Sequence, residues 1–495
     1  MGCQIIMKKV IVIGSGFSGL AAATKLADSG YDVCVIEKNT MPGGRAQIFQ
    51  EQGFLFDMGP SWYWMPDIFD RYFQEFGKKT SDYYHLKRLD PSYQVIFKNK
   101  ETVALPANLN KLEDLFESIE PGSASQLKSF LKESKYKYEV GIGEFVWKPS
   151  LSIKEFFDFR ILSKAISLDL FASFGKHIRK FFKNEQILQM MEFPILFLGA
   201  TPQNTPALYS LMNYAEIALG TWYPMGGMFE VVKAMHHLAL EKGVKFQFSE
   251  SVTKIEVNQK RVHKVITSKG EYQADFVVGG ADYQHIESCL LETKERNYDK
   301  KYWDSRVMAP SSLLFYLGID RKVEKLIHHN LFFDEDFQVH AHEIYENPQW
   351  PSKPLFYVCA PSKTDSSVAP ENCENIFILS PIAPDLEDNE EIREKYYHII
   401  MDRLEKYVGH TIREHVVYKR SFAVEDFKST YNSFKGNAYG LANTLMQTAF
   451  LKPNLKNKNI DNLYYTGQLT VPGPGVPPSL ISGLVVAQQI IKENK

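Results

Sequence analysis

Three glycines and an acid near the N-terminus have the residue types and the spacing that bind a dinucleotide. Gly14, Gly16 and Gly19 follow a short apolar run, and Glu37 stands after a second one. Gly14 permits a tight strand-to-helix turn, Gly16 lets the backbone approach a pyrophosphate, and Gly19 lets helix and strand pack closely. The free N–H groups at the helix start favour an anion, and Glu37 can accept hydrogen bonds from two ribose hydroxyls. Because a carboxylate suits an unphosphorylated ribose, the pattern favours FAD or NAD over NADP.

The elements that must hold these residues are also present in the sequence. Residues 8–13 form a β-branched run that is typical of a buried parallel strand. Residues 20–29 have the small apolar side chains of a packed helix, and Gly30 can cap its C-terminal end. Residues 31–36 predict a second strand that ends at Glu37. This order predicts an α/β fold with a Rossmann-like domain, and an accidental glycine turn is the alternative.

A Gly-Gly-Arg sequence after the second strand indicates which dinucleotide is bound. Gly43, Gly44 and Arg45 resemble the second diphosphate contact of the FAD-binding superfamily that includes amine oxidases. Arg45 can neutralise a phosphate while the glycines let the backbone approach it. Residues 56–61 resemble the segment that runs beside the flavin in that superfamily. The resemblance implies FAD, and the alternative for the Pro-Gly-Gly stretch is a plain surface turn. It also places at FAD the residues Lys38, Gly59, Pro60, Ser61 and Trp62.

Two later segments resemble returns of the chain to the nucleotide domain. Residues 223–282 contain a glycine turn, a helical pattern and several short strands, for which an ordinary β-meander is the alternative. Residues 462–487 predict a strand, a Gly/Pro-rich loop and a final helix, whose N-terminus can stabilise negative charge on a reduced flavin. The resemblance places at the cofactor the residues Val252, Asp282, Gly467, Val476 and Pro477.

These returns predict an interleaved, amine-oxidase-like flavoprotein. The FAD-binding domain would comprise residues 8–96, 221–300 and 456–495. An α+β substrate domain would comprise residues 97–220, which also include the expected membrane-facing lobe, and residues 301–455.

Several longer stretches resemble the bacterial phytoene desaturase family of FAD-dependent carotenoid desaturases. They are residues 59–66, 198–209, 361–374 and 472–477, and the resemblance extends from Lys8 to Ile490. It implies successive FAD-dependent dehydrogenations of a phytoene-type hydrocarbon to a lycopene-type product. Other carotenoid-modifying flavoenzymes (a 3,4-desaturase, an isomerase or a saturase), an amine oxidase, and a non-redox prenyl-lipid escort protein are the alternatives.

The sequence departs from the family pattern at two places near the expected flavin. Residues 467–471 lack the histidine that many members carry before the final Pro-Gly, and Met225 stands where many have a basic residue. These departures leave open the precise substrate and the number of desaturations.

The reaction implied by the resemblance is hydride transfer to the flavin with proton loss from the neighbouring carbon. An allylic cation makes the adjacent C–H acidic, so a weak base suffices. Two acids are candidates for the catalytic acid/base. Glu155 aligns with an Arg-Asp pair of some relatives, although it forms a simple solvated charge pair with Lys154 in the alternative interpretation. Asp57 lies near the expected flavin, where ordering its loop is the alternative role.

Composition excludes several other classes of protein. The formal net charge of −2 gives no basic field for nucleic acid. Five scattered cysteines without a CxxC pair argue against a disulfide framework, and no metal site is expected. The pairs His236-His237 and His328-His329 are interpreted as surface or packing residues.

A hydrocarbon substrate implies contact with a membrane surface. No stretch approaches the ~20 apolar residues that span a bilayer, and no signal peptide is predicted. We expect a peripheral protein at the cytoplasmic face of the cell membrane, with a quinone or oxygen as electron acceptor and with oligomerisation left open. Residues 156–183 predict a basic amphipathic helix at that surface, and a helix that covers the substrate lobe is the alternative.

Overall fold

A computed structural model describes residues 7–152, 155, 172–196 and 199–494. Five parallel strands form the nucleotide sheet in the order β19-β13-β1-β2-β9. Their bounds are Lys9–Ile13 for β1, Asp32–Ile36 for β2, Lys245–Gln247 for β9, Phe276–Gly279 for β13 and Leu463–Tyr465 for β19. The five strands of this sheet thus come from three separate stretches of the chain, within residues 9–36, 245–279 and 463–465.

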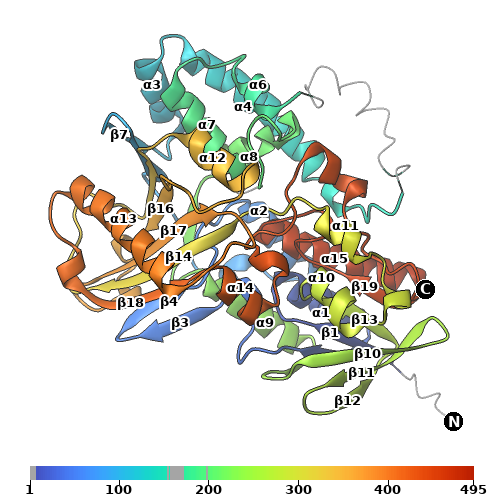
Figure 1. Ribbon diagram of the computed structural model, residues 1–495. Helices are drawn as coiled ribbons and strands as arrows, with labels where there is room; N and C mark the ends of the chain where they lie inside the picture. Colours follow the sequence, from blue (N-terminus) through green and yellow to red (C-terminus); the bar gives the residue numbers. More distant parts are fainter. Residues whose placement is uncertain (1–6, 153–154, 156–171, 197–198, 495) are drawn as a thin grey trace.

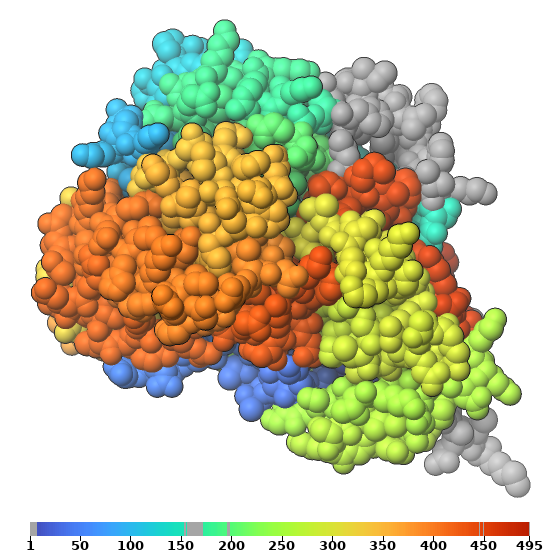
Figure 2. Space-filling view, viewed as in Figure 1, coloured from blue at the N-terminus to red at the C-terminus, as the bar shows by residue number. Residues whose placement is uncertain are grey.

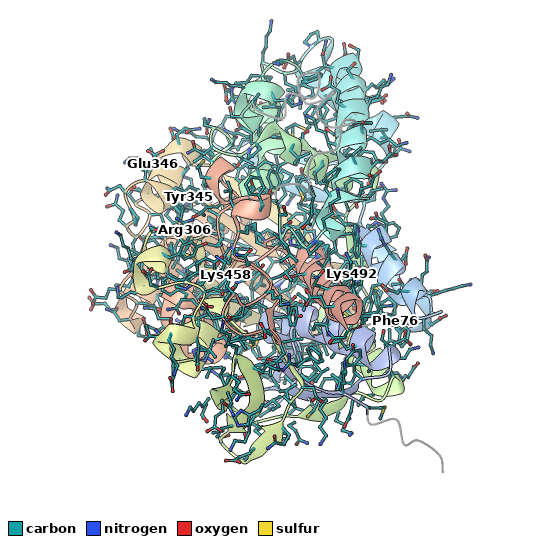
Figure 3. The ribbon with its side chains drawn as sticks, turned by 90° about the vertical axis from the view of Figure 1, so that its right-hand side faces the viewer. Phe76, Arg306, Tyr345, Glu346, Lys458 and Lys492 are labelled. Atoms are coloured by element: carbon teal, nitrogen blue, oxygen red, sulfur yellow. The ribbon has the colours of Figure 1, made fainter. Side chains whose placement is uncertain are left out.

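Two helices from opposite ends of the chain pack against each other beside this sheet. Helix α1 (Phe17–Asp28) follows β1, and the C-terminal helix α15 (Val476–Glu493) lies along it. A Cβ atom at Gly483 of α15 would overlap the carbonyl oxygen of Ser18 in α1, so only glycine allows this approach. Figure 3 shows α15, with Lys492 in its last turn, alongside the first elements of the chain. The contact fixes the N-termini of both helices at the same edge of the sheet.

A second sheet of seven strands, in the order β18-β14-β17-β16-β15-β6-β7, builds the substrate domain. All neighbours are antiparallel except β15 and β6. Helix α13 (Glu390–Val408) covers one face and buries Ile400, Met401 and Leu404 against it (Figure 1). The strands are β6 (Tyr93–Phe97), β7 (Thr102–Leu105), β14 (Ser311–Ile319), β15 (His329–Phe333), β16 (Phe356–Cys359), β17 (Glu374–Ile382) and β18 (Val416–Phe422).

The predicted domain boundary after residue 96 falls inside β6, which pairs with β15 of the substrate sheet. The first crossing into the substrate domain therefore begins a few residues earlier than predicted. The sequence pattern of a buried strand does not depend on which sheet the strand joins. The pattern of residues 93–97 therefore could not show where the chain enters the substrate domain.

A helical lobe lies above the seven-stranded sheet in Figures 1 and 2 and forms one continuous surface with it. It contains α3 (Leu109–Ile119), α4 (Ser123–Gly141), α6 (Phe174–Ile178), α7 (Glu185–Leu196) and α8 (Leu211–Asn213).

The predicted amphipathic helix 156–183 is described only in part, because residues 156–171 lie outside the described residues. The described end contradicts the proposed membrane face. Phe174 and Ile178 are fully buried in the core of the lobe, and Arg179 forms an ion pair of 2.6 Å with Glu192. The four-residue spacing of apolar side chains marks here the side of a helix that faces the protein.

The remaining strands and helices lie outside the two sheets. A three-stranded meander consists of β10 (Val252–Asn258), β11 (Arg261–Thr267) and β12 (Glu271–Gln273). The other strands are β3 (Ile48–Glu51), β4 (Phe54–Asp57), β5 (Leu86–Arg88) and β8 (Trp222–Pro224). The other helices are α2 (Pro66–Glu75), α9 (Phe229–Glu241), α10 (Tyr283–His285), α11 (Lys300–Asp304), α12 (Phe337–Tyr345) and α14 (Val424–Tyr431). None of the described helices is both long and apolar enough to cross a bilayer.

Candidate active site

A cavity of about 930 Å³ lies where the nucleotide sheet, the substrate sheet and the helical lobe meet. Every residue predicted to bind the cofactor lines it except Gly19, where a Cβ atom would overlap the carbonyl oxygen of Gly14. Gly19 therefore has the packing role that the sequence analysis gave it. The lining residues from that prediction are Gly14, Gly16, Glu37, Lys38, Gly43, Gly44, Arg45, Gly59, Pro60, Ser61, Trp62, Val252, Asp282, Gly467, Val476 and Pro477.

Two helix N-termini face this cavity without side-chain caps. Gly16 caps α1 and Gly475 caps α15, and neither offers a side chain to the free N–H groups of the first turn. Pro477 and Pro478 occupy the first turn of α15 and have no N–H, and the N–H of Ser479 donates to the carbonyl of Gly475. Within residues 476–479 only Val476 therefore keeps a free N–H, whereas the start of α1 contains no proline. Uncapped N–H groups at a helix start attract anionic or electron-rich groups. A Cβ atom at Gly16 would meet nothing within 4 Å, so the space in front of α1 is open to a ligand.

The carboxylate of Glu37 is fixed at the end of β2. Its Oε2 accepts hydrogen bonds from the backbone N–H of Ser15 (2.9 Å) and from the Ser15 hydroxyl (2.8 Å), and its Oε1 accepts from the N–H of Asn39 (2.9 Å). These contacts orient the acid toward the cavity. Ser15 was not predicted from the sequence to have a role, although its place between two motif glycines was the available signal.

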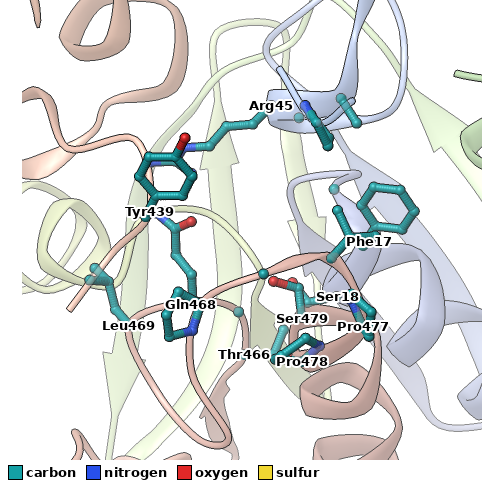
Figure 4. A pocket seen from close by; sticks show the side chains of 18 of the residues that line it. Phe17, Ser18, Arg45, Tyr439, Thr466, Gln468, Leu469, Pro477, Pro478 and Ser479 are labelled. Atoms are coloured by element: carbon teal, nitrogen blue, oxygen red, sulfur yellow. The ribbon is translucent and has the colours of Figure 1, made fainter. Parts of the chain in front are cut away.

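Arg45 is a half-buried cation that lines the cavity. Its Nη2 donates to Ser433 Oγ (2.9 Å), whereas its Nε has no hydrogen-bond partner among the described residues. Burial lowers the pKa of Arg45, and the nearby carboxylate of Asp282 opposes that shift. Figure 4 shows the guanidinium reaching across the cavity toward Tyr439 and Gln468. An anionic phosphate would satisfy the unpaired N–H, since a buried donor without a partner is costly.

The described residues therefore fit FAD. The uncapped start of α1, an oriented ribose-type acid and the guanidinium of Arg45 with its unpaired Nε surround one cavity.

Trp62 forms a wall of the cavity and is held by a packed histidine. The His329 ring stacks on it with centroids 3.9 Å apart, and His329 Nδ1 lies 2.6 Å from the hydroxyl of Tyr357. The Tyr357 hydroxyl in turn donates to Ser61 Oγ (3.0 Å). Burial lowers the pKa of His329 well below its usual value, so its ring packs as a neutral imidazole. The packing role expected for this histidine is thus observed, whereas Tyr357 was not anticipated.

The end of the cavity away from the nucleotide motifs is mainly apolar. Its walls come from the end of α4, from α8 and the turn before it, and from strands β14 and β17 of the substrate sheet. The sequence analysis assigned these segments to the substrate domain without singling out residues. The apolar and aromatic side chains include Tyr136, Val140, Ile142, Phe145, Leu208, Leu211, Met212, Leu314 and Leu379.

The two acids proposed as catalytic do not line the cavity. Asp57 accepts hydrogen bonds from the backbone N–H groups of Met228 (2.7 Å) and Phe229 (3.0 Å) at the start of α9. Burial raises the pKa of Asp57 to about 7, against the effect of these two donors. The Glu155 carboxylate accepts from three backbone N–H groups, those of Ser150, Leu151 and Ser152. The contacts of Asp57 match its loop-ordering alternative. The alternative for Glu155 was a charge pair with Lys154, which lies outside the described residues.

Replacing Asp57 tests these two roles against each other. We expect Asp57→Ala to lower the free energy of unfolding by about 1–2 kcal/mol, because the start of α9 loses its acceptor. We expect Asp57→Asn, which keeps one acceptor oxygen, to retain most of the turnover. A fall in kcat of about 100-fold or more in the asparagine variant would instead identify Asp57 as the proton acceptor. Chemical denaturation and steady-state kinetics measure the two quantities.

Comparison with known proteins identifies the family. A family model described as flavin containing amine oxidoreductase matches residues 17–491. A carotenoid 3,4-desaturase of Haloarcula japonica is 41% identical over 486 residues, which are 98% of each chain. This chain belongs to the flavin-containing amine oxidoreductases, and among them to the carotenoid desaturases. The predicted family and cofactor are confirmed: the enzyme is an FAD-dependent oxidoreductase that acts on CH–CH bonds.

Further relatives of this flavin-containing oxidoreductase are also desaturases. A zeta-carotene-forming phytoene desaturase of Myxococcus xanthus is 30% identical over 98% of this chain and 94% of its own. A 4,4'-diapophytoene desaturase of Staphylococcus haemolyticus is 30% identical over 98% and 99%. Among solved structures, an oxidoreductase from Methanosarcina mazei has a TM-score of 0.62 at 14% identity, covering 98% of this chain and 100% of its own. A putrescine oxidase has a TM-score of 0.60 at 14% identity, covering 98% and 99%. The structural matches confirm the predicted α/β flavoprotein fold.

Proposed function

We propose that this enzyme introduces a 3,4-double bond into a long carotenoid polyene. The supporting observation is a cavity of about 930 Å³ that is lined both by the FAD-binding motifs and by apolar side chains of the substrate domain. The sequence analysis placed the conversion of phytoene to a lycopene-type product first and 3,4-desaturation among the alternatives. The 41% identity to a 3,4-desaturase, against 30% to a phytoene desaturase, supports the reverse order. Phytoene desaturation is the second candidate, supported by the relatives at 30%.

In this proposal the chain contributes binding, orientation and exclusion of water. The residues at α1, Glu37 and Arg45 would hold FAD, which when bound accepts a hydride from the substrate carbon. The apolar residues of α4, α8 and β14 would align the polyene, and Trp62, stacked on His329, would fix its position from one side. Holding the reacting carbon in one place supplies much of the rate in such a reaction. The proton would leave a carbon that its cationic neighbour makes acidic, so the reaction does not require a dedicated base. A large loss of turnover in a variant of Glu155 or Asp57 would be needed to assign that role to either acid.

Product analysis in cells tests the proposal. We expect cells that accumulate lycopene and express this chain to yield pigments that absorb at longer wavelength and have lost two hydrogens per new double bond. We expect cells that accumulate phytoene to remain colourless. Coloured product from phytoene alone would favour the second candidate. Unchanged carotenoids in both strains, with normal flavin content, would contradict a carotenoid substrate.

We also propose that the enzyme works at a membrane surface and passes its electrons to a quinone or to oxygen. Exposed apolar side chains near the cavity support the first part. Met446 is 74% exposed and Phe450 is 40% exposed, on either side of Thr448, which lines the cavity. Such side chains can enter the headgroup region of a bilayer and bring the cavity close to a dissolved hydrocarbon.

A further inference from the structure

Lys452 is a buried amine without a hydrogen-bond partner among the described residues. Its side chain is only 4% exposed, and its Nζ is buried and unpaired. Burial alone lowers the pKa of Lys452 to about 7, and no charged group of the described chain contributes to that shift. A lysine in such a place is rare in a soluble protein unless a ligand or a neighbouring group satisfies it.

Asn443 also lies beside the turn at Gly473, next to Lys452. Its Oδ1 is also buried without a partner, and Asn443 lines the main cavity. A Cβ atom placed on Gly473 would lie 3.2 Å from Asn443 Oδ1 and 3.2 Å from Lys452 Nζ. Lys452 Nζ and Asn443 Oδ1 therefore both lie close to the turn at Gly473, and of the two residues only Asn443 lines the cavity. The two neighbours of this glycine, Pro472 and Pro474, line the cavity.

The two groups define the chemistry of their partner. Lys452 donates hydrogen bonds, and Asn443 Oδ1 accepts one. A partner must therefore offer an acceptor and a donor close together, as a hydroxyl or an imide does. A pure hydrocarbon offers neither, so an apolar substrate leaves both groups unpaired.

We propose that Lys452 and Asn443 form a polar subsite at the edge of the cavity, which binds a ligand group that both accepts and donates hydrogen bonds. Two sources have this chemistry: a hydroxyl on the carotenoid chain, and the imide edge of the flavin ring. Binding of a carotenoid hydroxyl rests on the proposed function, whereas binding of the flavin imide depends only on the FAD site.

The experiment uses the flavin-loaded enzyme with Lys452→Met, Asn443→Leu and, as a matched control, Lys301→Met at an exposed position of α11. One arm measures FAD affinity and the visible flavin spectrum. The other measures the ratio of kcat/KM for a hydroxylated polyene to that for an unsubstituted polyene of equal length. We expect both subsite variants to change one arm by about tenfold and the control to change neither, because each removes a hydrogen bond to a buried group. A changed flavin arm identifies the imide, and a changed ratio identifies the hydroxyl.

Thermal unfolding separates this role from a structural one. Because the folded pKa of Lys452 is lowered, the unfolded chain binds more protons than the folded chain between pH 7 and about 10.5. The lysine therefore destabilises the fold most at and below about pH 7 and least above about pH 10.5. In the flavin-free protein we expect Lys452→Met to raise Tm at pH 7 and the difference from the wild type to shrink by pH 10.

Two results would overturn the proposal. A lower Tm of Lys452→Met at pH 7 would show that the amine is a structural group. If both subsite variants stay within about twofold of the Lys301→Met control in both arms, an ordinary buried water satisfies the two groups. The flavin arm needs no carotenoid, so a failure of the proposed substrate leaves this part of the test intact.

Discussion

Replacing Gly16 by valine is expected to abolish FAD binding while leaving the protein folded. Gly16 has a φ of −70°, which any residue adopts, and a Cβ atom there would meet nothing within 4 Å. A valine therefore fits the protein itself and projects into the space in front of α1. There it would exclude the pyrophosphate from the N–H groups of the helix start. Losing two or more charge-assisted hydrogen bonds predicts FAD binding weaker by about 100-fold or more.

Gly19 provides the contrasting variant. A Cβ atom at Gly19 would overlap the carbonyl oxygen of Gly14, so even alanine forces α1 away from β1. We expect Gly19→Ala to lower Tm and to lose FAD through damage to the fold, whereas Gly16→Val keeps Tm of the FAD-depleted protein. Fluorescence titration with FAD and thermal unfolding measure both. Bright yellow Gly16→Val protein with wild-type affinity would place the pyrophosphate elsewhere.

The nucleotide site was predictable because its information is local. The turn at Gly14, the approach at Gly16 and the acid Glu37 lie on one strand-helix-strand unit, and each residue type follows from the geometry of that unit. Predicted strands 8–13 and 31–36 agree with β1 and β2 to within a residue. Helix α1 begins at Phe17, three residues before the predicted start, because the motif glycine itself belongs to its first turn.

The substrate end was not predictable to the residue because its walls come from distant parts of the chain. Trp62 is positioned by His329, and His329 is held by Tyr357. Both partners lie more than 260 residues after Trp62 in the sequence. The contacts of Asp57 are of the same kind, since its partners Met228 and Phe229 belong to the next return of the chain. A single sequence shows which residue types stand at these positions, but it does not show which of the residues are in contact. Phe174 and Ile178, the described part of the predicted amphipathic face, are buried in the protein for a related reason: a buried face and a membrane face have the same periodicity.

Filling the apolar end of the cavity should separate substrate binding from FAD binding. Gly141 is the last residue of α4 and lines the cavity. A Cβ atom there would make one ordinary contact, 3.4 Å from Leu211 Cδ2. Gly141→Phe therefore places an aromatic ring into the space that the polyene is proposed to occupy. We expect kcat/KM to fall by about 100-fold or more, because a displacement of about 1 Å at the reacting carbon already has that effect.

The same substitution leaves the nucleotide end untouched, so flavin content and its visible spectrum should equal those of the wild type. Gly141→Ala is the matched control, since its methyl group adds only the contact with Leu211 and removes a helix glycine. We expect the alanine variant to keep its activity and its Tm. A Gly141→Phe enzyme that binds FAD, melts normally and still desaturates at the wild-type rate would show that the polyene does not pass the end of α4. The hydrocarbon would then have to reach the flavin along the walls formed by β14 and β17, and the helical lobe would serve another purpose.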